Sequence, residues 1–195
     1  MVVSERSSSS VSACEARSNN SNATLGLRLE GARTTARASL GYLLELARQA
    51  DLGASALDYR ADYLHARASV EVAGVTVGGG YELLGGDRGV GFQTPLATLH
   101  KYNGFADVFL TTPGSGLVDR YGWLSWRLPA SSTLTLTHHD FVPDDSRGDL
   151  GRELDLVLAA PLPLGLRGAV KYAAFRSESS LPDLRRLTIQ LELVR

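Results

Sequence analysis

The chain has 195 residues, of which 44% are hydrophobic and 21% charged, and its formal net charge is −1. This length and composition suffice for one domain with a sizeable core and argue against a disordered chain. Without a net basic charge, we expect no nucleic acid among its main partners. The single cysteine, Cys14, excludes an intrachain disulfide framework. The β region contains no run of roughly 18 apolar residues, so a membrane could be crossed only by a β-barrel.

The N-terminal segment differs in composition from the rest of the chain. Residues 1–22 are rich in Ser and Asn and show no periodicity, which predicts a disordered leader before a β-barrel domain at 23–195. The leader lacks the apolar stretch of a secretory signal. An outer-membrane protein needs such a signal, so we expect the chain to be the C-terminal portion of a larger barrel or to have a misplaced start.

Nine segments alternate apolar and polar residues. In the last of them, Leu187, Ile189 and Leu191 interleave with Thr188 and Gln190. Successive side chains of a strand point to opposite faces, so each segment would have one apolar and one polar face. The segment 36–50 also has fair helix propensity, but its long alternation favours a strand. The predicted strands are 24–31, 36–50, 57–72, 75–84, 118–128, 133–141, 152–160, 166–175 and 184–194.

The connections between these strands alternate in length. Short turns at 33–35, 73–74, 129–132 and 161–165 alternate with longer loops at 51–56, 85–117, 143–151 and 177–183. Outer-membrane barrels have short periplasmic turns and long extracellular loops. The pattern therefore predicts an all-β fold, an antiparallel transmembrane β-barrel or partial barrel, with lipid against its apolar face. Nine is odd, whereas bacterial barrels close with an even number, so we expect strand edges that need partners. These would be missing N-terminal barrel strands or another barrel chain.

The longest loop has features of a helix. Thr94-Pro95 is a helix-start signal, and the apolar residues that follow stand at helical spacings. We predict an extracellular loop that is partly helical over 94–110 and folds against the mouth or the lumen. The alternative is a loop that only covers the mouth. The residues predicted to form a constriction are Thr94, Pro95, Leu99, Lys101, Tyr102 and Asp107.

Charged residues occupy the predicted inward face. In a pore they would tune ion and solute selectivity, whereas in a closed structural barrel they would pair across the lumen. Their signs nearly balance, which favours weak selectivity or pairing. Besides Arg28 and Glu30 of the first strand, the pore-lining candidates are Arg37, Glu45, Arg67, Glu71, Glu82, Asp119, Arg127, Glu153, Asp155, Arg167, Lys171, Arg186 and Glu192.

The densest group of possible metal ligands is His138, His139 and Asp140. Strand alternation turns His139 away from the other two, so we predict neither a metal site nor a cofactor. The Gly-rich segment 85–91 lacks the Lys-Ser/Thr of a phosphate loop, and no nucleophile elbow is present. We therefore do not expect an enzyme; an outer-membrane enzyme ranks third, after a channel and a non-conducting structural or anchoring barrel.

Several motifs are similar to one known family. GYELLGGD (80–87), GFQTPLATLHKYNGFADVFLTTP (91–113), HHDF (138–141) and the closing strand resemble the alginate-export-like porins of Gram-negative bacteria. The resemblance covers about 23–195 and corresponds to the C-terminal half of longer members. It implies a barrel in the cell outer membrane for passive passage of small solutes or anionic polysaccharide. The terminal Leu193-Val194-Arg195 departs from the aromatic end of such barrels.

Overall fold

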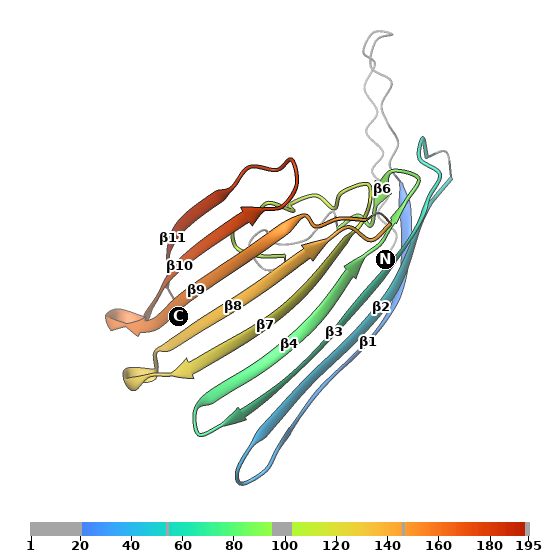
Figure 1. Ribbon diagram of the computed structural model, residues 1–195. Coiled ribbons are helices and arrows are strands. Elements are labelled where there is room, and N and C mark those ends of the chain that lie inside the picture. Colours follow the sequence, from blue (N-terminus) through green and yellow to red (C-terminus); the bar gives the residue numbers. More distant parts are fainter. Residues whose placement is uncertain (1–20, 54, 95–102, 146, 194–195) are drawn as a thin grey trace.

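The structure is a computed structural model, and it describes residues 21–53, 55–94, 103–145 and 147–193. Nine strands form one antiparallel sheet in which each strand pairs with its neighbours in sequence (Figure 1). They are β1 (Asn22–Thr34), β2 (Ser39–Asp51), β3 (Arg60–Val72), β4 (Val75–Leu84), β7 (Leu117–Arg127), β8 (Thr133–Val142), β9 (Gly151–Leu162), β10 (Leu166–Ser177) and β11 (Leu184–Leu193). A separate hairpin, β5 (Gly86–Asp87) and β6 (Val90–Gly91), lies in the loop after β4.

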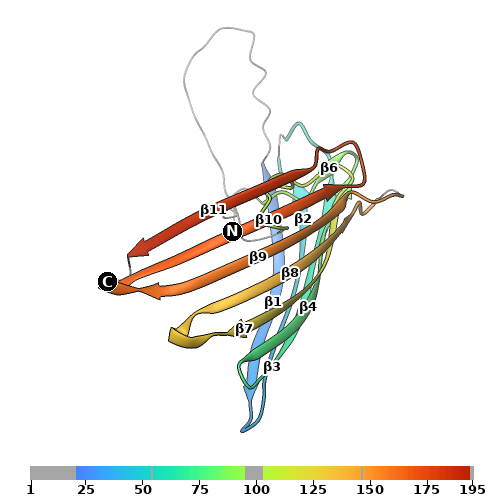
Figure 2. The ribbon, with the colours of Figure 1, turned by 60° about the vertical axis from the view of Figure 1, so that its left-hand side comes forward.

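The predicted antiparallel sheet of nine strands is confirmed, and most strand ends agree within three residues. All short turns lie on one rim and all long loops on the other (Figure 1). The direction of the strands changes steadily from β1 to β11, which is the twist of a curved wall (Figure 2). No helix within the described ranges is long and apolar enough to cross a membrane.

The start of β2 corrects one assignment. The sequence prediction placed Arg37 within a strand and facing the lumen, but it lies in the turn between β1 and β2. Thr35 closes this turn because its hydroxyl oxygen accepts a hydrogen bond from the Ala38 amide at 3.1 Å. Hydroxyl side chains favour such local turns over strand pairing. The predicted leader lies outside the described residues except at 21–22, where Asn22 begins β1.

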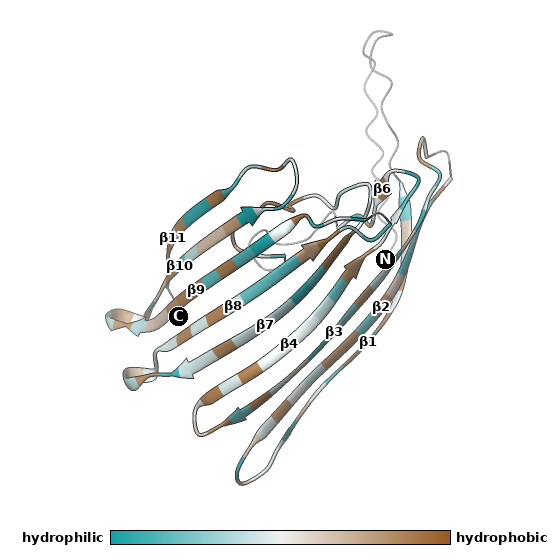
Figure 3. Cartoon of the chain, in the orientation of Figure 1, coloured by the Kyte–Doolittle hydropathy of each residue, from teal (hydrophilic) through white to brown (hydrophobic). Residues whose placement is uncertain are grey.

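The two faces of the sheet differ sharply in polarity, as the alternating colours along the strands show (Figure 3). On β9, Leu154 and Leu156 are 46% and 40% exposed, whereas Glu153 and Asp155 are each only 1% exposed. The apolar side chains therefore point away from the protein interior, and the carboxylates point into it. Exposed apolar residues of the same outward face include Leu25, Leu27, Leu44, Leu46, Val70, Val77, Leu158, Val170, Leu187, Ile189 and Leu191.

The apolar core lies on the inward face, close to the rim with the long loops. Phe141 and Phe175 of the sheet contribute to it, together with Phe92, Ala106 and Phe109 from the loop that joins β4 to β7. This β4–β7 loop thus folds against the sheet instead of extending into solvent. Its position on the inward side agrees with the prediction of a loop that occupies the mouth or lumen.

The predicted helix at 94–110 is wrong over its described part, residues 94 and 103–110, which contains turns but no helix. Asn103, Gly104 and Asp107 have φ values of 58°, 83° and 59°. These left-handed conformations cannot continue a right-handed helix. Residues 95–102, the other part of the predicted helix, lie outside the described residues.

β1 and β11 are the two edge strands of the sheet. Directions alternate through nine antiparallel strands, so β1 and β11 run the same way. Both edge strands carry exposed apolar side chains on the outward face, including Leu25 (83%) and Ile189 (70%). Unpaired backbone groups are costly in lipid, so these edges need a partner if the sheet lies in a membrane.

Candidate pore constriction

Cross-strand register gathers ionisable residues into a row on the inward face. Partners in successive strand pairs form one continuous line from β1 to β7, so five side chains that are far apart in sequence become neighbours. The row consists of Arg28, Glu45, His65, Glu82 and Asp119.

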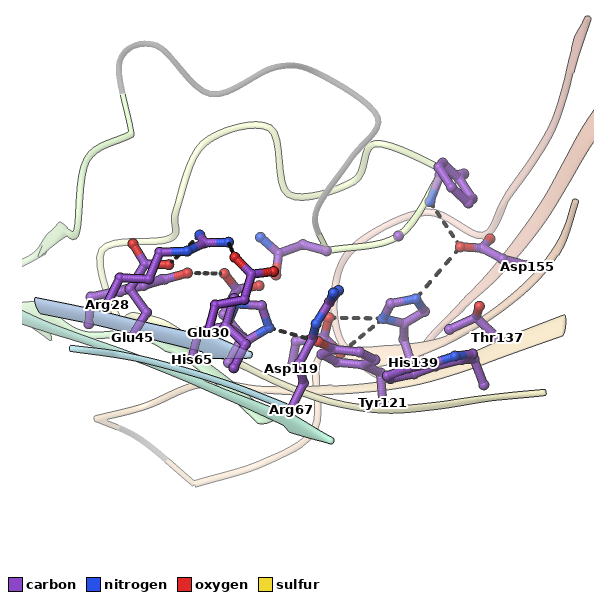
Figure 4. Close-up of a pocket in the computed structure, with 17 residues that line it drawn as sticks. Arg28, Glu30, Glu45, His65, Arg67, Asp119, Tyr121, Thr137, His139 and Asp155 are labelled. Carbon is purple, nitrogen blue, oxygen red and sulfur yellow. Dashed lines mark hydrogen bonds and ion pairs between the residues drawn. The ribbon is translucent and has the colours of Figure 1, made fainter. Parts of the chain in front are cut away.

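His139 lies at the centre of a buried polar network (Figure 4). Its Nδ1 is 2.8 Å from Asp119 Oδ2, and its Nε2 is 3.7 Å from Asp155 Oδ2. Its ring stacks on Tyr121, with centroids 5.5 Å apart. The Tyr121 hydroxyl is in turn 2.7 Å from His65 Nε2. The network connects β3, β7, β8 and β9 and holds these side chains in a fixed arrangement.

Two carboxylates of β9 hold the loop segment 103–109 against the sheet. Glu153 Oε1 accepts a hydrogen bond from the Ala106 amide at 2.7 Å, and Asp155 Oδ2 accepts one from the Phe105 amide at 3.1 Å. These hydrogen bonds satisfy one buried oxygen of each side chain. A Cβ at Gly104 would lie 2.5 Å from the Glu153 carboxylate, so only glycine permits this close approach.

Charged residues from β10 and β11 also hold this segment. Asp107 forms an ion pair with Arg186. Lys171 Nζ lies 4.8 Å from the centroid of the Phe105 ring, within the range of a cation–π contact. The segment 103–109 is therefore fixed to three consecutive strands.

An aromatic cluster anchors the end of the segment. The Phe109 ring lies 4.8 Å from that of Phe141 and 5.9 Å from that of Phe175, measured between centroids. Phe109 is 8% exposed, and the adjacent Ala106 is fully buried. Burial of a phenylalanine stabilises such a contact by roughly 1.5–3 kcal/mol.

A cavity of about 340 Å³ remains between the loop segment and the inward face of β1–β9. Figure 4 shows charged and aromatic side chains around it. Arg28 is paired there with Glu30 at 2.7 Å and Glu45 at 3.0 Å. Arg67 also lines the cavity and forms no ion pair with any described residue. The walls of the cavity thus carry both charge signs, together with aromatic rings.

A second polar network holds the first part of the β4–β7 loop. Gln49 accepts hydrogen bonds from the Tyr59 hydroxyl at 2.9 Å and the Gln93 amide at 2.7 Å. Its side-chain nitrogen donates to Gln93 O and to Thr24 Oγ1, both at 2.9 Å. Burial raises the pKa of the Tyr59 hydroxyl, and the nearby Asp51 adds to the effect.

The structure places the other twelve pore-lining candidates on inward positions of strands, leaving out only Arg37. They fall into groups that the sequence did not distinguish: Glu153 and Asp155 bind the loop segment, and Arg127 pairs with Glu71 at 2.6 Å. Of the constriction candidates, Thr94 and Asp107 are described, and Pro95, Leu99, Lys101 and Tyr102 lie outside the described residues. A role in conduction stays a prediction for all of them.

Sequence reasoning did not select His65 and His139 as site residues. Their inward position on alternating strands was the available signal. The predicted separation within the HHD motif is confirmed, because His139 is buried inward while His138 is exposed on the other face. Among the residues that the structure describes, no three His, Cys, Asp or Glu side chains are arranged so that they could hold a metal ion.

Comparison with known proteins identifies a fold. No family model matches the chain, and no curated protein matches it. A solved structure does match: OccK9 (OpdG) of Pseudomonas aeruginosa, an outer-membrane porin, with a TM-score of 0.69 and 20% sequence identity. The match covers 89% of this chain and 47% of OccK9, so the chain spans about half the length of that protein. The fold is that of a porin-type β-barrel wall; nothing in the comparisons supports the alginate-export family specifically.

Proposed function

We propose that this chain forms part of the wall of an outer-membrane porin through which small solutes pass passively. The observation that carries the proposal is the loop segment 103–109, which buried carboxylates of β9 hold on the inward face of the sheet. A loop fixed in this position narrows a lumen without filling it. The adjoining cavity of about 340 Å³, with charged side chains of both signs on its walls, provides space for water and small solutes.

The charges on the inward face support a weakly selective pore. Arg67 and Arg167 are exposed at inward positions and have no ion pair within the described ranges. Arg28, Arg127 and Arg186 are paired with carboxylates. The second candidate function is a non-conducting structural or anchoring barrel, which would fill its lumen with ion pairs of this kind. A catalytic role is not proposed.

The outer membrane is the location that fits both faces of the sheet. The outward leucines and valines suit lipid, and the polar inward face suits an aqueous lumen. The fold shared with OccK9 supports the same location. Membership of the alginate-export-like porins, and passage of an anionic polysaccharide, remain predictions from the sequence motifs.

The barrel needs further strands next to β1 and β11. Because these two strands run the same way, an antiparallel ring requires an odd number of additional strands. A second copy in the same orientation would place its β1 parallel to β11. We therefore propose that the remaining wall comes from further strands of a longer polypeptide or from another, non-identical barrel chain.

Conductance measurements test the channel proposal. The assembly containing this chain, purified through an affinity tag on it and inserted into a planar bilayer, should give ohmic conductance steps. Replacing both Glu153 and Asp155 with alanine should release the loop segment and increase the size of the steps. The matched control, Asp58→Ala, removes an exposed carboxylate that pairs with Arg88 outside the strands and should leave them unchanged.

Each outcome of the conductance experiment separates two candidates. Absence of steps would identify a non-conducting barrel. Steps that are equally large in the double variant and the original protein would place the constriction elsewhere, on the charged residues of the strands.

A further inference from the structure

Arginines gather on the outward face at the rim with the long loops. On six strands they occupy outward positions within three residues of that end, and all six are exposed. At the short-turn ends of the same strands, the outward positions are apolar, as with Leu40, Val72 and Trp126. Arg33 of β1 is an outward arginine at that opposite rim. The six arginines are Arg48, Arg60, Arg120, Arg152, Arg176 and Arg185.

Four of these residues form a cluster across β7–β11. Cross-strand register aligns Arg120 with Asp140, Asp140 with Arg152, and Arg152 with Arg176. Arg185 is on the neighbouring strand, paired with Ala174, one outward position from Arg176. We call Arg120, Arg152, Arg176 and Arg185 the arginine row.

The arginine row has an excess of positive charge. Asp140 interacts with Arg152 at 3.4 Å and with Arg120 at 3.9 Å, and Glu178 lies 3.6 Å from Arg152. Arg176 and Arg185 form no ion pair with any described residue. Arg152 and Arg176 are directly opposite each other, and like charges in this position destabilise a sheet unless an anion lies between them.

The residues below the arginine row show which anion could reach it. The next outward side chains along β9 and β11 are apolar: Leu154 and Leu156 are 46% and 40% exposed, and Leu187 is 65% exposed. The row thus lies where an apolar lipid-facing surface ends, at the level of lipid headgroups. Long loops mark the extracellular rim of outer-membrane barrels, so the headgroups belong to the outer leaflet.

We propose that the arginine row binds the phosphate groups of an outer-leaflet lipid. The planar guanidinium fork matches phosphate geometry and forms charge-assisted hydrogen bonds with it. One phosphate between Arg152 and Arg176 would relieve their repulsion, while the acyl chains of the same lipid cover Leu154 and Leu156. This inference rests on the proposed membrane location but does not depend on conduction.

Binding of a fluorescent lipid A with two phosphates to the purified assembly in detergent tests the proposal. The double variant Arg152→Gln, Arg176→Gln should weaken binding about tenfold or more, as expected for the loss of charge-assisted hydrogen bonds. The variant loses the repulsion between Arg152 and Arg176, but it also loses the ion pairs of Arg152 with Asp140 and Glu178. These pairs are partly exposed and contribute little to stability, so the variant should still fold. Arg33→Gln, at the opposite rim, is the matched control and should leave the affinity unchanged.

Two further probes define the ligand. Lipid A without its two phosphates should bind the original protein weakly. Its affinity should be no higher than that of intact lipid A for the double variant. Inorganic phosphate should compete only at concentrations far above that of the lipid, because it lacks acyl chains. The proposal is overturned if the double variant binds as tightly as the original protein, if the phosphate-free lipid binds equally well, or if inorganic phosphate competes as well as the lipid. Conductance of the same preparations tests the channel separately.

Discussion

The two faces of β9 have opposite environments. Leu154, Leu156 and Leu158 are 40–46% exposed on one face, whereas Glu153 and Asp155 on the other face are almost completely buried. In a water-soluble sheet the leucines would be inside and the carboxylates outside. This difference is why we propose that lipid lies against the outward face of this strand.

The buried carboxylates show how the inward face is stabilised. A buried polar group is costly unless it is hydrogen-bonded, and one oxygen of each side chain accepts an amide hydrogen from the segment 103–109. Their polarity is therefore used to hold a loop within the curve of the sheet. The difference between the faces connects the membrane location to the proposed constriction, and it can be tested at single residues.

The largest effect is expected from a charge on the outward face. Leu156→Arg should lower the free energy of unfolding by roughly 2–4 kcal/mol, because the guanidinium would lie in lipid near the middle of a strand. Thr137→Arg is the matched control: it adds the same group on the adjacent strand but points into the cavity opposite Asp155. Urea unfolding from phospholipid vesicles measures both. Equal losses would contradict the assignment of the faces.

A smaller effect is expected at Gly104, where the loop touches β9. Gly104→Ala should cost at least about 1–2 kcal/mol for the left-handed backbone, and more because its Cβ would lie 2.5 Å from the Glu153 carboxylate. Gly89→Ala is the control, since Gly89 has a similar φ of 78° but no atom within 4 Å of the added Cβ. If the loop contacts β9, Gly104→Ala should lose more stability than Gly89→Ala. Only Gly104→Ala should then show larger conductance steps. Identical behaviour of the two variants would argue against the loop contact.

The smallest effect on stability is expected from the exposed ion pair of Arg127 and Glu71. Arg127→Gln should change the free energy of unfolding by less than about 1 kcal/mol, because both side chains are solvated. It leaves an unpaired carboxylate on the inward face, so ion selectivity should shift towards cations. Reversal-potential measurements across a salt gradient would detect the shift. An unchanged reversal potential would mean that Arg127 and Glu71 do not face the ion pathway.

The sheet could be predicted from the sequence because period-two alternation and turn length are local properties. The strand start at 36 was misplaced since the local hydrogen bonds of Thr35 compete with pairing. The structure of the loop could not be predicted in the same way. Its anchors, Glu153 and Asp155, are 47 and 50 residues away from their amide partners in the loop. Left-handed conformations at Asn103 and Asp107 interrupt a pattern whose apolar spacing otherwise suited a helix.

The most direct test of the account is thiol labelling along β8 in lipid vesicles, in a Cys14→Ser background. Single cysteines at the inward positions of Thr135 and Thr137 should react with a charged, membrane-impermeant reagent, whereas cysteines at Leu134 and Leu136 should be protected by lipid. The account predicts this alternation with a period of two residues. Uniform labelling along the strand, or protection of the threonine positions instead, would contradict it.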